Sequence, residues 1–215
     1  MAPATLRVTE IFFSLQGETS RVGLPTVFVR LTGCPLRCRW CDTPYSFQGG
    51  QTLDIADILT QVAVWHPRHV TVTGGEPLAK KHCCSLLAAL CDAGYDVSLE
   101  TGGALDIAEV DPRVCRILDI KPPGSGEAQR NRWENLAALA ARDEVKFVLA
   151  GREDYEWAKR VMREHGLAER CPVLFSPVYG ELQARQLADW MLEDRLPARL
   201  QIQLHKALWG EERGR

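Results

Sequence analysis

The chain lacks the segments that direct a protein out of the cytosol or into a membrane. Its first ten residues contain no basic stretch followed by an apolar one, so we expect no secretory signal. No apolar run approaches the ~20 residues that a membrane helix needs, so we also expect no membrane partner. Together these features predict a cytoplasmic protein.

The chain also lacks an excess of charge of one sign. Its 26 Lys and Arg residues nearly balance 28 Asp and Glu residues, the net charge is −2, and the basic residues are dispersed. This pattern argues against nucleic acid as a partner, because nucleic-acid-binding proteins carry a basic patch or stripe. Internal repeats and low-complexity segments are missing as well, so the 215 residues are expected to form a single domain, 1–215.

Three of the eight cysteines lie close together, in Cys34-Pro-Leu-Arg-Cys38-Arg-Trp-Cys41, but no fourth Cys or His follows at metal-ligand spacing. A structural zinc site takes four protein ligands, and a ferredoxin-type cluster takes four thiolates. Three thiolates would leave one iron of a four-iron cluster open for a substrate or cofactor, which predicts a catalytic site. Spacing alone leaves two alternatives: a zinc site completed by a distant residue, or three unrelated core thiols. The other five cysteines are predicted to pack as small apolar residues.

Short apolar runs alternate with helical patterns along the chain. This alternation predicts an α/β fold with a parallel sheet and right-handed crossovers. The crossovers are uneven and a Gly-bearing loop joins the first two strands, so we expect an open or partial (β/α) barrel. The expected strands are 6–13, 26–32, 69–73, 96–100, 116–120, 145–149, 172–175 and 200–204, and the expected helices are 55–64, 81–93, 131–141, 154–165 and 181–193.

The cysteine loop and a Gly-rich segment, Thr73-Gly74-Gly75-Glu76-Pro77, both come directly after predicted strands. Active sites of parallel α/β folds lie at the carboxyl ends of the strands, so the two segments are expected at one edge. The paired glycines let backbone approach a ligand closely, or they form a plain turn before a helix. At the same edge, Glu100-Thr101-Gly102 is either a ligand segment or a turn, and 122–126 is predicted to be an active-site loop.

With these motifs the chain resembles the radical S-adenosylmethionine (SAM) superfamily, whose signature is Cys-x3-Cys-x2-Cys followed by Gly-Gly-Glu-Pro. Within that superfamily it is similar to the 7-carboxy-7-deazaguanine synthases of deazapurine (queuosine) biosynthesis. The similarity rests on Leu15-Gln16-Gly17-Glu18, Arg30, Cys41-Asp42-Thr43 and Gln203-Leu204-His205-Lys206. It extends from residue 6 to residue 209 and leaves a short C-terminal extension, 210–215.

The resemblance implies three cofactors: a 4Fe-4S cluster, SAM and Mg²⁺. The metal ligands would be Cys34, Cys38 and Cys41 for the cluster and the Thr43 hydroxyl for Mg²⁺. The substrate-binding residues would be Leu15, Gln16, Gly17, Arg30, Thr73 and His205, with the planar guanidinium of Arg30 matching a substrate carboxylate. The SAM-binding residues would be Gly75, Glu76, Lys121, Ser176, Pro177, Val178 and Tyr179. In the segments 119–121 and 176–179, only Lys121 and Pro177 match the family's pattern.

The resemblance also implies a reaction and its partners. A lyase of this family contracts the ring of 6-carboxy-5,6,7,8-tetrahydropterin, giving 7-carboxy-7-deazaguanine with loss of ammonia. A flavodoxin or ferredoxin would reduce the cluster, and the protein would be a homodimer.

Two other functions are weighed against this one. The first is a radical-SAM activating enzyme for a glycyl-radical partner; it requires an open peptide groove in place of a pterin-sized pocket built from Gln16, Arg30 and His205. The second is a zinc-binding or redox-sensing module, which metal content would distinguish.

Overall fold

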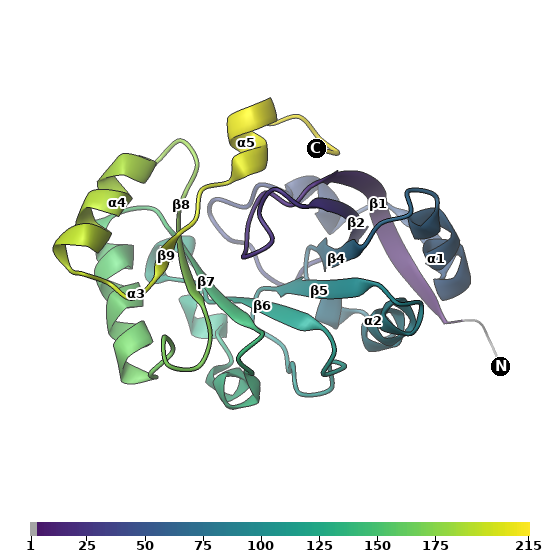
Figure 1. Ribbon diagram of the computed structural model, residues 1–215, viewed down its shortest axis with the longest axis horizontal. Helices are drawn as coiled ribbons and strands as arrows, with labels where there is room; N and C mark the ends of the chain where they lie inside the picture. Colours follow the sequence, from purple (N-terminus) through teal and green to yellow (C-terminus); the bar gives the residue numbers. More distant parts are fainter. Residues whose placement is uncertain (1–3) are drawn as a thin grey trace.

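A computed structural model describes residues 4–215, in which nine strands form one sheet (Figure 1). The strand order is β3-β1-β2-β4-β5-β6-β7-β8-β9, so β3 and β9 are the two edges and the barrel is open. The strands are β1 Thr5–Leu15, β2 Pro25–Leu31, β3 Gln51–Asp54, β4 His69–Gly74, β5 Asp96–Thr101, β6 Cys115–Asp119, β7 Glu144–Leu149, β8 Val173–Pro177 and β9 Arg199–Leu200.

The sheet is mixed, which corrects the expectation of a purely parallel sheet. All pairs from β2 to β9 are parallel, but β1 pairs antiparallel with both β2 and β3. The short loop between β1 and β2 has no room for a helical crossover, so the two strands can only form a hairpin. The α/β class and the open barrel are confirmed.

Four longer helices pack against the strands on one face of the sheet: α1 Ile55–Ala63, α2 Cys83–Asp92, α3 Arg152–Glu164 and α4 Ala184–Glu193 (Figure 1). Their buried side chains and those of the strands form one hydrophobic core. Helix α1 begins where Asp54 accepts a hydrogen bond from the Asp57 N–H, as an N-cap residue should. None of the helices in residues 4–215 has the length and hydropathy of a membrane span.

The expected helix 131–141 is wrong, because this stretch contains only a 3-10 helix, η5 Trp133–Ala138. Asn135 is buried there, and its amide nitrogen donates to the carbonyl oxygens of Gly103 and Leu105. These contacts to a distant loop override the helical preference of an Ala-rich segment. The other 3-10 helices are η1 Pro44–Phe47, η2 Pro77–Ala79, η3 Pro123–Ser125 and η4 Ala128–Arg130.

The expected strand 200–204 is also wrong beyond Leu200. Strand β9 ends there, and a short helix, α5 Leu204–Trp209, follows. The Leu204 N–H donates to the Gly17 carbonyl, 2.9 Å away, so the chain leaves the sheet edge and runs toward the β1–β2 loop. In Figure 1, α5 lies above the sheet, away from α1 to α4.

The two faces of the sheet differ in polarity because side chains alternate along each strand. In β7, Val145 and Phe147 belong to the hydrophobic core, whereas Lys146 and Val148 point to the opposite face. In β4, Val72 belongs to the core and Thr73 lies on the opposite face. The inner face of the open barrel is therefore polar, and it is the face on which a site can form.

Candidate active site

A cavity of about 660 Å³ lies on the inner face of the sheet, at the carboxyl ends of the strands. The β1–β2 loop, the cysteine loop, the ends of β4 to β7 and the C-terminal segment all contribute to its lining. Most of the predicted site residues line it: Leu15, Gln16, Gly17, Arg30, Cys34, Cys38, Cys41, Thr43, Thr73, Gly75, Glu76, Lys121, Val178, Tyr179 and His205. Ser176 and Pro177 are buried in β8 and are not part of the lining.

The three predicted cluster cysteines face this cavity and are partly buried. Burial raises the pKa of the Cys38 thiol to about 11 and also raises the pKa of Cys34. Within residues 4–215, no three His, Cys, Asp or Glu side chains are grouped closely enough to hold a single metal ion. A four-iron cluster does not require such a group, because each of its three protein thiolates binds a different iron. Three part-buried thiols that line one cavity fit the ligand set of a four-iron cluster with one iron left open.

The predicted active-site loop, 122–126, supports the cysteine loop. The Arg39 N–H donates to the Ser125 carbonyl at 3.0 Å, and the Arg37 N–H donates to the Glu127 carboxylate at 2.6 Å. The 122–126 segment itself does not line the cavity. It contacts the cysteine loop at Arg39, whose Nε also donates to the Gly124 carbonyl at 3.2 Å.

The two glycines of the Gly-Gly-Glu-Pro segment are required by close packing. A Cβ atom on Gly75 would lie 2.5 Å from the Gly33 carbonyl oxygen and 2.7 Å from the Cys34 Cβ. Glu76 is fully buried, and its carboxylate accepts hydrogen bonds from the Leu78 N–H, the Thr101 hydroxyl and the Gly102 N–H. The segment is thus held rigidly against the cysteine loop, where the two line one wall of the cavity.

The opposite wall is formed where α5 meets the β1–β2 loop. The His205 ring lies directly against Gly17, and a Cβ atom on Gly17 would be well inside the van der Waals contact distance of the His205 Nδ1. Burial lowers the pKa of His205, which favours the neutral imidazole, although nearby Glu18 opposes this. A neutral ring can both donate and accept a hydrogen bond from a ligand.

Arg30 is oriented by acidic and aromatic neighbours. Its Nε donates to the Glu10 carboxylate at 2.6 Å, and its guanidinium lies 5.9 Å from the centre of the Phe12 ring and 6.0 Å from that of Tyr45. Among the described residues, only the Nε of this side chain has a hydrogen-bond partner. The two terminal nitrogens remain to bind a carboxylate that enters the cavity.

Thr43 follows the third cysteine, and its hydroxyl does not cap the η1 helix that begins after it. The hydroxyl lies 3.9 Å from the Cys41 sulfur. It therefore presents an oxygen ligand to the cavity, of the kind that Mg²⁺ accepts.

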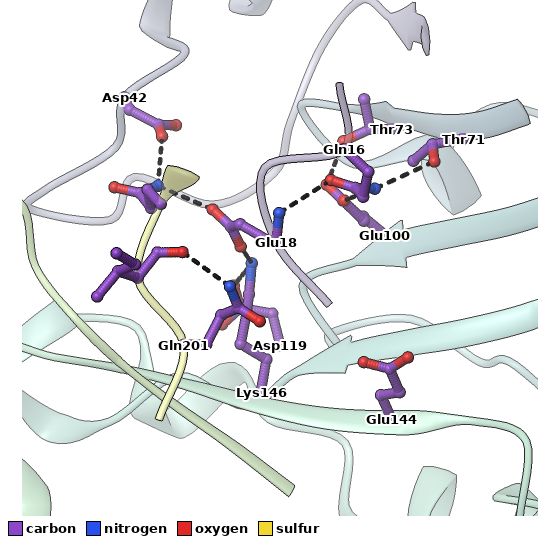
Figure 2. Close-up of polar contacts among 12 residues, drawn as sticks. Gln16, Glu18, Asp42, Thr71, Thr73, Glu100, Asp119, Glu144, Lys146 and Gln201 are labelled. Atoms are coloured by element: carbon purple, nitrogen blue, oxygen red, sulfur yellow. Dashed lines mark hydrogen bonds and ion pairs between the residues drawn. The ribbon is translucent and has the colours of Figure 1, made fainter. Parts of the chain in front are cut away.

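A network of charged side chains crosses the cavity floor (Figure 2). The Lys146 ammonium lies 2.5 Å from the Glu18 carboxylate and 3.4 Å from that of Asp119. Asp119 also pairs with Lys121 at 3.0 Å. Burial opposes the ionisation of Glu18, but Lys146, with smaller contributions from the Gln203 hydrogen bond and His205, outweighs it and lowers the pKa of Glu18 to about 2.

Glu100 is shifted in the opposite direction. Burial raises its pKa, the positive charge of Lys146 opposes the shift and the negative charge of Glu18 adds to it. Its carboxylate accepts hydrogen bonds from the Thr73 hydroxyl at 3.0 Å and the Gln16 amide at 3.4 Å. The pKa values of Glu18 and Glu100 are therefore shifted in opposite directions. Glu18 can act as an anionic hydrogen-bond acceptor, while Glu100 more readily holds a proton.

The C-terminal segment closes one side of the network. The Gln203 amide donates to Glu18 at 2.8 Å and to Asp42 at 3.4 Å. Lys206 pairs with Asp42 at 3.5 Å. Residues 210–215, beyond the family resemblance, also line the cavity, and the Arg213 guanidinium lies 4.2 Å from the centre of the Tyr45 ring.

Sequence reasoning did not assign roles to several cavity residues: Glu18, Asp119, Lys146 and Lys206. It left Glu100 in a segment that is either a ligand segment or a turn, and Glu100 lines the cavity. The signal for Lys146 lay in the strand 145–149, where one charged residue interrupts an otherwise apolar run. A charge at that position must either disrupt the sheet or face a polar cavity.

Known proteins share this sequence pattern and fold. A sequence model of the Radical SAM superfamily matches residues 28–168, so the chain is a radical SAM protein. The 7-carboxy-7-deazaguanine synthase of Chlorobaculum tepidum is 46% identical over 212 residues, covering 97% of this chain and 96% of the relative. That of Koribacter versatilis is 41% identical, covering 96% and 98%. The chain belongs to the 7-carboxy-7-deazaguanine synthase family.

Solved structures agree on the fold. The crystal structure of QueE from Escherichia coli matches with a TM-score of 0.76 at 22% identity, covering 94% of this chain and 95% of that chain. Streptococcus suis SuiB bound to S-adenosylmethionine matches with a TM-score of 0.54 at 14% identity, covering 80% of this chain and 44% of that chain. The second match is limited to part of SuiB.

Proposed function

We propose that the chain is a lyase that contracts the ring of 6-carboxy-5,6,7,8-tetrahydropterin to 7-carboxy-7-deazaguanine, with loss of ammonia. One observation carries the proposal: the three cysteines share one cavity with a polar set comprising Gln16, Arg30 and His205. At about 660 Å³ the cavity is within the size range of small-molecule sites. The cofactors are a 4Fe-4S cluster, SAM and Mg²⁺, as membership of the family requires.

The protein's own residues would bind and orient the substrate. Cys34, Cys38 and Cys41 would hold the cluster and Gly75 and Glu76 would contact SAM, and these two cofactors would supply the radical chemistry. Arg30 would pair with the substrate carboxylate, and Thr43 would hold Mg²⁺ near the same group. The polar inner face would meet the amino and carbonyl groups of the pterin, and α5 would limit access of water.

The alternative of a glycyl-radical activating enzyme requires a groove that admits a peptide. The cysteine loop, the β1–β2 loop and α5 instead line one cavity of about 660 Å³ that contains Gln16, Arg30 and His205 together. A volume of this size supports the small-molecule substrate. Membership of the radical SAM family favours the enzyme over the zinc-binding or redox-sensing alternative.

An anaerobic turnover assay tests the function. The protein is reconstituted with iron and sulfide and supplied with SAM, reductant, Mg²⁺ and 6-carboxytetrahydropterin, and products are read by mass spectrometry. The expected product is 7-carboxy-7-deazaguanine, and it should require SAM. Cleavage of SAM with an unchanged pterin would reject the substrate, and turnover by Cys38→Ala would reject radical SAM chemistry altogether.

We extend the proposal to the partners and location of the protein. A flavodoxin or ferredoxin would supply the electron, in the cytoplasm, without membrane or nucleic acid as partner. Residues 1–215 would form a single domain, supported by the continuous sheet and shared core of the described part. A homodimer is supported by the unpaired outer edges of β3 and β9, and a solution mass near twice 24.0 kDa is expected.

A further inference from the structure

Lys146 is a buried cation that the family resemblance does not assign. Its side chain is only 9% exposed, and its ammonium contacts the carboxylates of Glu18 and Asp119. In Figure 2, Lys146 and Glu18 point toward each other across the floor of the cavity. A buried charge lowers the stability of the fold unless it is paired, and here two carboxylates pair it. The question is what this buried ion pair does for the site.

The position of Lys146 in the sheet links the two walls of the cavity. Its neighbour in the β6–β7 register is Asp119, which pairs with Lys121. Lys121 and Glu76 both lie next to Gly102. A Cβ atom placed on Gly102 would be 3.6 Å from the Lys121 Cε and 3.3 Å from the Glu76 Oε2. This is the wall predicted to bind SAM.

Glu18 belongs to the other wall, which is predicted to bind the pterin. One carboxylate oxygen accepts from Gln203 at 2.8 Å and the other from Lys146 at 2.5 Å. Each oxygen of an ionised carboxylate can accept a second hydrogen bond. Glu18 also lines the cavity, so these remaining acceptor sites are available to a ligand.

We propose that Lys146 is a positioning residue: its ammonium holds Glu18 ionised and in place, so that Glu18 can accept N–H groups from the amino-pyrimidinone edge of the substrate. The inference rests on the proposed function, because that function supplies the pterin. An ionised carboxylate is an acceptor only and matches two adjacent N–H donors, whereas a protonated one loses half of this match.

The charges around Glu18 determine what the loss of Lys146 does. Lys146 comes from β7, His205 from α5, Glu100 from β5 and Asp119 from β6. In the wild type the pKa of Glu18 is about 2, so the group stays ionised at all working pH values. Without Lys146, burial raises the pKa of Glu18 against the smaller opposing effects of the Gln203 hydrogen bond and His205, so the group takes up a proton at a higher pH than in the wild type.

Equilibrium dialysis of 6-carboxypterin tests the proposal. The reconstituted enzyme is used with SAM and Mg²⁺ but without reductant, and free pterin is read by fluorescence between pH 5.5 and 8. Affinities of each variant are divided by those of the wild type at the same pH, so that titrations of the ligand cancel. For Lys146→Met we expect binding to be weaker by about 10- to 100-fold at the acidic end, with recovery as the pH rises.

Glu18→Gln and the double variant Glu18→Gln with Lys146→Met complete the cycle. If Lys146 acts through Glu18, the double variant binds no more weakly than Glu18→Gln alone, and neither shows the acid-dependent loss. The double variant retains His205, so a pH dependence that survives in it does not arise from Glu18. It also removes both partners of the ion pair, which keeps the test valid if Lys146→Met alone does not fold.

Lys159→Met is the matched control. Lys159 also pairs with two carboxylates, those of Glu156 and Asp194, but it lies on α3 outside the cavity. Its loss should leave pterin binding unchanged. A pH-independent effect of Lys146→Met, or a double variant weaker than Glu18→Gln by the full Lys146→Met factor, overturns the inference. A wild type that binds no 6-carboxypterin and makes no product overturns the proposed function instead.

Discussion

At the scale of single residues, the absence of a side chain at Gly17 determines how α5 meets the β1–β2 loop. The Gly17→Ala variant should displace the His205 ring, because the new methyl group would occupy its place. A displacement of about 1 Å in a substrate-positioning group costs on the order of 100-fold in rate. We expect kcat/KM for the pterin to fall by about that factor in the anaerobic turnover assay.

The matched control for Gly17→Ala is Gly151→Ala. A Cβ atom on Gly151 meets nothing within 4 Å, and its φ of −177° is extended backbone open to any residue. This control should keep its activity and its melting temperature. Wild-type activity in Gly17→Ala would show that His205 does not need its present position.

Arg30 permits a test of which ligand group it recognises. Arg30→Lys keeps the positive charge but loses the planar pair of terminal nitrogens. We expect 6-carboxypterin to bind roughly 10-fold more weakly to this variant, and pterin without the 6-carboxyl group to bind equally to variant and wild type. Equilibrium dialysis of the two ligands measures both values. An equal loss of affinity for both ligands would show that Arg30 does not bind the 6-carboxylate.

At the scale of elements, regular strands and amphipathic helices were predictable, whereas segments held by distant side chains were not. Strands β4 to β7 agree with the expected ranges within a residue or so, because their apolar runs reflect burial. The stretch 200–204 alternates apolar and polar residues like a strand, yet its end is set by the hydrogen bond from Leu204 to Gly17. Local patterns cannot reveal a partner nearly two hundred residues away.

The residues of the candidate site likewise divide into those that could be predicted from the sequence and those that could not. Residues in contiguous motifs, such as the three cysteines and Gly75, were predicted because their spacing is itself the signal. Lys146 and Glu100 come from different strands and line the same cavity only because the register of the sheet brings β5, β6 and β7 together. Their charges inside apolar strands indicated a polar cavity but not which groups would face each other.

The loop 122–127 should contribute to the stability of the cluster. The Glu127 carboxylate accepts from the Arg37 N–H between two of the cysteines. In Glu127→Ala this restraint is lost, and because the contact is exposed to solvent we expect only a few-fold faster loss of iron to a chelator. Absorbance of the cluster measures the rate. Glu134→Ala, an exposed position on η5, is the control and should match the wild type.

At the scale of the whole molecule, one sheet and one core connect α1 to α4. Helix α1 packs on β1 and β3 at one end of the sheet, and α4 packs on β8 and β9 at the other. Ile58 of α1 and Leu187 of α4 are both fully buried in the same core. A chain built in this way should unfold as one cooperative unit.

This cooperativity can be tested with one cavity-forming substitution at each end. Ile58→Ala and Leu187→Ala should each lower the free energy of unfolding by about 2 to 5 kcal/mol, because each removes a buried aliphatic side chain. In anaerobic urea titrations, each variant should shift the whole transition without changing its slope, and far-UV and near-UV circular dichroism should give the same midpoint. If the two ends folded independently, each substitution would move only part of the signal. The cavity, which takes its residues from β1 through α5, would then depend on the docking of two separately stable halves.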